Sequence, residues 1–390
     1  MSTPRRAEKG TWWFVVDLPP GGDGKRRQAK RRGFRTKAEA QAALDELRVG
    51  VRRGTYVAPV RQTFGDFLTN DWLPAIRTTI EPSTHASYSR YLRLHVIPEL
   101  GGIGLQQLDA GMLNRLYADL LDHGRKNGKP GGLSPRTVRY VHTIIGRALR
   151  EAMAWDRVAR NVAQAAQPPG VAQAKSPEMR TWDAATLARF LHLVREDRHQ
   201  PAWLFLATTG CRRGEALGIR WTDVDLVAAK VVLYQTITAV DHQLRIAPRT
   251  KSGKPRPIEI DSATVAALRA VRKRQAEERL LLGPEFEDHD LVFARPDGKP
   301  QHPEHFSNAF ERRVARYKLP RIRLHDLRHT WATLALEAGV DVKIVSERLG
   351  HASAKITWDI YQHVTPTMQS DAAETVARLI FGDDAARWTE

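Results

Sequence analysis

A stretch rich in proline, alanine and glutamine, residues 164–177, is the strongest constraint on how this chain can fold. Such a composition favours a connection between separate folding units over a long helix or strand. A chain of 390 residues is also too long for one ordinary hydrophobic core. A second break, marked by Gly54 and Pro59, falls near the start. We therefore expect three domains, at residues 1–57, 62–166 and 178–390.

The chain is strongly basic, with 61 lysines and arginines against 44 aspartates and glutamates and a formal net charge of +17. This favours a polyanionic partner such as nucleic acid, because bound phosphates release counterions; an unusually basic surface is the alternative. Cys211 is the only cysteine, which excludes an internal disulfide and a cysteine-based zinc site. No apolar run approaches the length that a bilayer needs, and no secretory segment follows the charged start. We therefore expect a cytoplasmic protein without a membrane partner.

Residues 1–57 hold 14 lysines and arginines and 6 acidic residues, a net charge of +8. Thr11–Asp17 is rich in β-branched and aromatic residues and predicts a strand, and Lys25–Phe34 predicts a basic return strand. Thr36 and Glu39 form a capping box that begins a helix. The cationic face of such a hairpin suits a DNA groove, although a solvated charged hairpin is the alternative. The candidate DNA-binding residues here are Arg26, Arg27, Lys30, Arg31 and Arg32.

Four helix starts follow one another in residues 62–166. Each is a capping residue before apolar residues at helical spacing, and the four are Thr63, Ser83, Asp109 and Ser134. We expect an all-α domain whose apolar stripes form its core. Basic residues outside the stripes are candidates for phosphate contacts, and we name Arg136 and Arg139.

The domain at 178–390 mixes strands and helices. A helix start lies at Asp183, and helices resume at His305. Strands are predicted at Val231–Val240, Leu244–Ile260 and Leu291–Phe293. The expected fold class is therefore multidomain and mainly α with small sheets: a small sheet with one helix, an all-α domain and an α+β domain.

Two motifs in the third domain carry cations. Arg212 and Glu215 are three residues apart and would share a helical face, so the carboxylate could orient the guanidinium for a pair of phosphate oxygens. Lys251 lies at a turn between two predicted strands, where it could reach into a cleft and donate a proton. Each signal is weak alone, because a surface ion pair or a solvated lysine has the same pattern.

A third cluster lies at residues 323–364. His325 and Arg328 are also three apart and would present a base and a cation at one helix edge. His351 follows a glycine, and Tyr361 lies ten residues beyond it. A tyrosine with a pKa of about 10 needs nearby cations or a base to act as a nucleophile. Histidines 325, 329 and 351 invite a metal site, but no carboxylate or thiol cluster accompanies them and nearby arginines would repel a cation. We expect no metal.

Taken in order, these motifs resemble those of the tyrosine recombinases, and specifically of phage-type integrases. The resemblance in motif covers residues 180–364, and the layout of residues 1–166 is similar, with looser motifs, to the arm-binding and core-binding domains of the larger integrases. The matching segments are Thr209-Gly210-Cys211-Arg212-Arg213-Gly214-Glu215, Thr250-Lys251 with Arg256, His325-Asp326-Leu327-Arg328-His329-Thr330, Leu349-Gly350-His351 and Tyr361.

The resemblance implies a site-specific DNA recombinase that integrates or excises a mobile element and needs no cofactor. Tyr361 would attack a DNA phosphodiester and form a 3′-phosphotyrosyl bond, while Arg212 and Arg328 clamp the non-bridging oxygens. The remaining roles would fall to His325 (deprotonation of Tyr361), His351 (a hydrogen bond to the phosphate), Lys251 (protonation of the leaving 5′-oxygen) and Glu215 (support).

The implied partners are double-stranded DNA at core and arm sites and three further copies of the chain in a tetramer on DNA. Host DNA-bending or directionality factors are further candidates. A C-terminal tail helix at residues 371–381 would dock on a neighbouring subunit; packing on its own domain is the alternative. Two other functions stay open, a type IB topoisomerase and a DNA-binding regulator with an inactive catalytic domain. The basic N-terminal unit disfavours the first, and the intact set of motifs disfavours the second.

Overall fold

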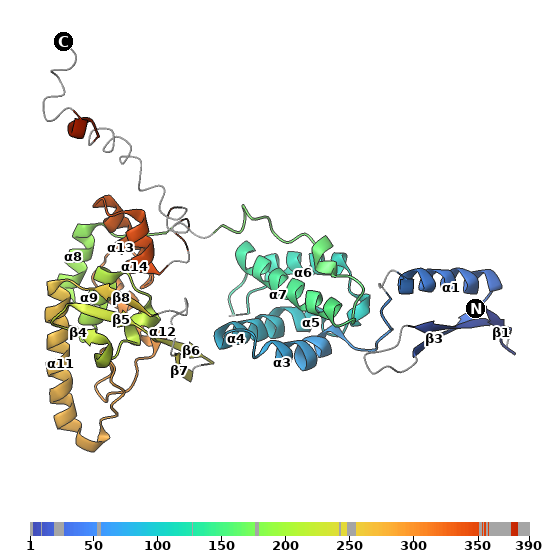
Figure 1. Ribbon diagram of the computed structural model, residues 1–390, viewed down its shortest axis with the longest axis horizontal. Coiled ribbons are helices and arrows are strands. Elements are labelled where there is room, and N and C mark those ends of the chain that lie inside the picture. Colours follow the sequence, from blue (N-terminus) through green and yellow to red (C-terminus); the bar gives the residue numbers. More distant parts are fainter. Residues whose placement is uncertain are drawn as a thin grey trace, which may run out of the picture. The chain divides into compact units, whose positions relative to one another are not determined.

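The computed structural model describes residues 3–8, 10–18, 27–52, 56–126, 128–175, 179–241, 243–247, 255–350, 353, 355, 358 and 376–380 (Figure 1). It separates into two compact units, Met1–Ser176 and Pro177–Glu390, with the boundary inside the expected linker. Among the helices that it describes, none combines the length and apolar character required to cross a bilayer. Arg26, Lys251, His351, Tyr361 and most of the expected tail helix lie outside the described residues, as does the side chain of Arg27.

The first unit begins with a three-stranded antiparallel sheet backed by one helix. Strands β1 (Arg5–Arg6), β2 (Trp12–Leu18) and β3 (Arg27–Phe34) lie in that order, and helix α1 spans Lys37–Arg52. The predicted capping box forms, because the backbone N–H of Glu39 donates to Thr36 Oγ1 at 3.1 Å and its carboxylate accepts from the N–H of Arg35 at 3.0 Å. Alternate sheet residues pack against the helix, and this small core contains Phe14, Val16, Ala29, Ala40, Leu44 and Leu47.

The rest of the first unit is helical. One continuous helix runs through α2 (Phe64–Asp66), η1 (Phe67–Trp72) and α3 (Leu73–Ile76), and a second through α4 (Pro82–Tyr91), η2 (Leu92–Val96) and α5 (Ile97–Leu100). Helices α6 (Ala110–His123) and α7 (Pro135–Ala154) follow, with short 3₁₀ turns η3 (Leu105–Gln107) and η4 (Val162–Ala165). Thr63, Asp109 and Ser134 cap their helices as predicted. The prediction for Ser83 was wrong: that helix begins at Pro82, whose fixed φ suits a first turn, and Glu81 precedes it.

The second unit combines helices with two small antiparallel sheets, and the β6-β7 sheet projects from its body (Figure 1). Its elements are α8 (Ala184–Leu193), α9 (Gln200–Thr209), α10 (Arg213–Leu217), η5 (Trp221–Asp223), β4 (Val224–Asp225), β5 (Lys230–Leu233), β6 (Thr236–Val240), β7 (Gln243–Ala247), β8 (Arg256–Glu259), α11 (Ser262–Leu282), η6 (Gly283–Glu285), α12 (Pro303–Arg316), α13 (Asp326–Glu337) and α14 (Val342–Leu349). Helix α9 is central, because it contacts α8, α10, α11 and α13. It therefore joins the segment before Arg212 to the helix that carries Arg328.

The strand predictions in this unit needed two corrections. The run Val231–Val240 is broken at residues 234–235, and its halves belong to different sheets, β4-β5-β8 and β6-β7. Leu291–Phe293 is buried but is not a strand: Leu291 forms a single bridge with Arg220, and the N–H of Val292 donates to Ile219 O at 2.9 Å. A short apolar run indicates that a segment is buried, but it does not show that the segment pairs with another strand. Here the three apolar side chains fill the core while the backbone forms only an isolated bridge.

Two leucines on helix α11 allow a matched test of this core. Leu268 is 1% exposed and Leu281 is 86% exposed. Because Leu268→Ala leaves a cavity, we expect it to lower the free energy of unfolding of the second unit by about 2–5 kcal/mol. Leu281→Ala, the same change in solvent, should shift it by less than about 0.5 kcal/mol. Urea denaturation of both variants measures the difference, and equal losses would contradict this packing.

Candidate active site

The segment that carries Arg212 is held in place by a glycine and a carboxylate. Gly210 ends α9 in the left-handed region (φ 65°), and its N–H donates to Leu206 O at 3.0 Å. Arg212 is then the residue before α10, and its backbone N–H donates to Glu215 Oε2 at 2.9 Å. The expectation that both lie on one helical face is corrected: Arg212 precedes the helix, and Glu215 caps it from the third position.

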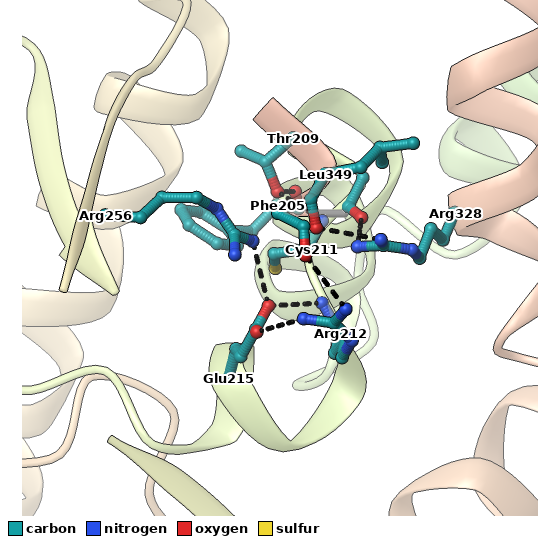
Figure 2. Close-up of polar contacts among 10 residues, drawn as sticks. Phe205, Thr209, Cys211, Arg212, Glu215, Arg256, Arg328 and Leu349 are labelled. Carbon is teal, nitrogen blue, oxygen red and sulfur yellow. Dashed lines mark hydrogen bonds and ion pairs between the residues drawn. The ribbon is translucent and has the colours of Figure 1, made fainter. Parts of the chain in front are cut away.

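The Glu215 carboxylate lies between two arginines (Figure 2). Arg212 Nη1 donates to Oε1 at 2.8 Å, and Arg256 Nη2 donates to Oε2 at 3.0 Å. Glu215 is only 2% exposed. Burial alone would raise the pKa of Glu215, but the charge of Arg256 and the hydrogen bonds from Arg212 outweigh it and lower that pKa below its ordinary value. The carboxylate is therefore ionised at neutral pH and fixes the direction of both guanidinium groups.

Arg328 reaches the same place from α13. It is buried, and its Nη1 and Nη2 donate to Gly210 O at 2.9 Å and to Leu349 O at 2.8 Å (Figure 2). Arg212 Nη2 donates to the next carbonyl, Gly350 O, at 3.3 Å. Two arginines from distant parts of the chain thus meet at the backbone immediately before position 351. Backbone carbonyls orient both guanidinium groups, and Glu215 also pairs with Arg212, so both planar groups have fixed directions, as a site for an anion requires.

His325 stands at the edge of this cluster. It is the residue before α13, so the expectation that it lies within the same helix as Arg328 is corrected by one position. The residue is exposed, and its ring lies 5.3 Å from that of His329, centroid to centroid. Desolvation, with His329 and Arg328 as further causes, lowers the pKa of His325 to about 4. The imidazole is therefore neutral at pH 7 and can accept a proton or a hydrogen bond.

Arg256 is the residue of this site that received no role from the sequence. It closes the Thr250–Arg256 motif and lies at the start of β8, and its side chain is only 11% exposed. The available signal was an arginine at a strand start within a motif, which does not reveal a partner 41 residues away. Its contact with Glu215 makes it a positioning residue for Arg212.

The other predicted DNA-binding residues lie in the first unit. Lys30 and Arg32 are exposed and pair with Val15 and Trp13, on the sheet face opposite the core, and Lys30 Nζ lies 4.6 Å above the Trp13 ring. Arg31 is exposed but alternates to the face that α1 covers. The remaining two lie on α7. Arg136 is exposed, whereas Arg139 Nη1 donates to Pro169 O at 2.9 Å and so braces the backbone that leaves the helical domain.

Comparisons with known proteins agree on one kind of protein. Residues 183–368 match the phage integrase family, residues 5–49 an arm DNA-binding domain and residues 63–121 the N-terminal SAM-like domain of phage integrases. A tyrosine recombinase XerC-like protein of Caldanaerobacter subterraneus is 27% identical, over 95% of this chain and 97% of its own length. The Tn1549 transposon integrase, solved with circular intermediate DNA, has a TM-score of 0.66 at 20% identity over 81% of this chain and all of that one. A lambda integrase tetramer on a Holliday junction has a TM-score of 0.55 at 15% identity, over 90% and 96%.

The fold, the paired arginines and these matches define the class: the protein is a tyrosine recombinase. Within that class the chain belongs to the phage integrase family, and its second unit is the catalytic domain. The sequence resemblance to phage-type integrases is thereby confirmed, and so is the expected fold class of small-sheet, all-α and α+β parts.

Two glycines test how tightly this site is built. Gly350 (φ 67°) and Gly339 (φ 79°) both follow helices in the left-handed region, so alanine costs about 1–2 kcal/mol of backbone strain at either position. A Cβ on Gly350 would also lie 2.1 Å from Arg256 Nη1, whereas one on Gly339 meets nothing within 4 Å. We expect Gly350→Ala to lower the denaturation midpoint of the second unit clearly more than Gly339→Ala. Adding Arg256→Ala to Gly350→Ala should remove part of that excess, and simple additivity of the two changes would contradict the clash.

Proposed function

We propose that this protein is a site-specific DNA recombinase that integrates or excises a mobile element through a covalent protein–DNA intermediate. The Tyr361 oxygen attacks a backbone phosphorus, a 3′-phosphotyrosyl bond forms, and the bond to the 5′-oxygen breaks. A 5′-hydroxyl of a second duplex later attacks the phosphotyrosine and reverses the exchange. Because the phosphodiester energy is kept in the protein–DNA bond, the cycle needs no nucleotide cofactor.

One observation carries this proposal: Arg212 and Arg328 converge on the consecutive carbonyls of Leu349 and Gly350, directly before His351. In the proposed roles the two guanidiniums bind the non-bridging oxygens, where negative charge grows in the transition state. Their fixed directions support this role, because a preorganised donor needs no rearrangement during the reaction. His351 would then hydrogen-bond the same phosphate. Glu215 would act through Arg212, not on the DNA.

Protons must leave Tyr361 and reach the 5′-oxygen. We assign the first transfer to His325, and its lowered pKa supports this because a neutral imidazole is ready to accept a proton. Lys251 would supply the proton to the leaving 5′-oxygen. Both assignments rest on the family motifs, since Lys251 and Tyr361 lie outside the described residues.

In this proposal each domain acts on a different part of the DNA. Residues 1–57 would bind arm sites through Arg26, Arg27, Lys30, Arg31 and Arg32, residues 62–166 would bind the core site with Arg136 and Arg139, and residues 178–390 would cut it. The exposed cations of β3 support the first assignment. By likeness to the lambda integrase tetramer on a Holliday junction, four copies would act together, with host bending or directionality factors and in the cytoplasm.

The nucleophile can be tested by trapping the intermediate. A duplex with the recombination site and a nick beside the cleaved phosphate should yield a covalent protein–DNA adduct, because the short leaving strand diffuses away. Tyr361→Phe should abolish the adduct on denaturing gels while binding to the same duplex persists. An adduct of undiminished yield in that variant would mean that another residue is the nucleophile.

The clamp can be tested separately. Arg212→Ala and Arg328→Ala should slow adduct formation by about 10²-fold or more, the scale for losing one preorganised donor. Arg328→Lys keeps the charge but not the planar fork, so it should be slow as well while keeping more of the fold. Arg279→Ala is the control: it removes an exposed arginine of α11 that pairs with Asp288, and this variant should cleave DNA at the normal rate. Normal cleavage in all three clamp variants would contradict the assignment.

A further inference from the structure

A pocket of about 440 Å³ opens beside the proposed clamp, within the second unit. Arg212 and His325 form one part of its lining, so it is continuous with the candidate active site. Its other polar lining residues come from α10, α12 and the segment before α13, and they are Arg213, Ser307, Glu311 and Arg323. Three arginines and one glutamate line it, and two of these arginines, Arg212 and Arg323, pair with carboxylates outside the lining.

Arg213 differs from the other two arginines of the lining in its partner. Its Nη1 donates to Ser307 Oγ at 2.6 Å, and no carboxylate among the described residues forms an ion pair with it. Arg212 has Glu215 and Arg323 has Asp326 at 2.7–2.8 Å. Desolvation lowers the pKa of Arg213, and Glu304 opposes this only through its charge. A partly desolvated guanidinium bound to a neutral hydroxyl is stabilised when an anion joins it.

Ser307 and Arg323 complete the surroundings. Ser307 accepts from Arg213, so its own hydroxyl proton can be donated to a ligand oxygen. Arg323 is oriented by Asp326, which accepts from Nε at 3.1 Å and from Nη2 at 2.7 Å. Its Nη1 has no partner among the described residues. Glu311 is the one carboxylate in the lining. The hydrogen bond and the charge of Asp326 raise the pKa of the Arg323 guanidinium, and the charge of Glu311 adds to this, so both carboxylates act on Arg323. An anion would therefore bind on the side of Arg213 and Ser307.

We propose that this pocket binds a second backbone phosphate of the cleaved strand, next to the phosphate at Arg212 and Arg328, through Arg213 and Ser307 with Arg323 at the rim. The proposal rests on the proposed function. A strand that places one phosphate on Arg212 must carry a neighbouring phosphate one nucleotide away, and Arg213 is the adjacent residue of the chain. Two fixed phosphates would set the direction of the strand and hence which bond faces the nucleophile.

The test neutralises one phosphate at a time. In nicked duplexes, each phosphate within two positions of the cleaved one is replaced by a methylphosphonate, and adduct formation is timed. With the wild-type protein, one flanking position should slow the reaction by about 10-fold or more, as expected for losing hydrogen bonds to a charged group. Arg213→Ala should be slow by a similar factor on the all-phosphate duplex and should lose little more with the methylphosphonate at that position. Ser307→Ala keeps α12 and Arg213. It should slow adduct formation less than Arg213→Ala does, and the methylphosphonate at the same flanking position should have a reduced effect on its rate.

Arg316→Ala is the matched control, because it removes an exposed charge from the same helix, α12, outside the pocket. It should retain the wild-type rate and the full methylphosphonate effect. Equal methylphosphonate effects in the wild type, Arg213→Ala and Ser307→Ala would overturn the proposal, and so would a wild type that tolerates every flanking neutralisation. If Arg213→Ala fails to fold, the Ser307→Ala pattern decides. Absence of any wild-type adduct would instead reject the proposed function.

Discussion

The buried carboxylate of Glu215 is the interaction on which the rest of the site depends. It accepts from the backbone and the side chain of Arg212 and from Arg256, so one charge orders the start of α10 and the start of β8 together. A carboxylate this deeply buried would be costly alone, and two guanidiniums offset its lost hydration. Removing it would leave two cations close together with no shared partner. The buried carboxylate thus orients the arginines that surround it.

Hydrogen bonds orient the two arginines of the proposed clamp, Arg212 and Arg328. Arg328 binds two backbone carbonyls, and Arg212 binds a carbonyl as well as Glu215. These carbonyls and the Glu215 carboxylate fix the directions of the two guanidiniums, which is what the proposed phosphate clamp requires. The same contacts tie the end of α14 to the loop after α9. Arg213 follows a related principle, because a hydroxyl holds it in place without neutralising it.

Local patterns in the sequence were accurate where a short segment decides its own structure. Of the four helix caps predicted in residues 62–166, three, at Thr63, Asp109 and Ser134, accept backbone N–H groups. Ser83 failed because Pro82, one residue earlier, is the better first residue of a helix. The strand at Val231–Val240 failed because its halves pair with different partners, a choice that no local propensity contains. His325 was misplaced by a single residue, at a helix start where boundaries are least certain.

The sequence by itself determined the basic character of the chain and the family to which it belongs, and it predicted the catalytic set Arg212, Lys251, His325, Arg328, His351 and Tyr361. It could do so because residue types and spacings carry that information directly. Tertiary structure decided which partners the described cations bind. The contact of Arg256 with Glu215 spans 41 residues, that of Arg328 with Gly210 spans 118, and that of Arg212 with Gly350 spans 138. Such contacts depend on how α9, α13 and α14 pack, and packing is a property of the whole core, not of any one motif.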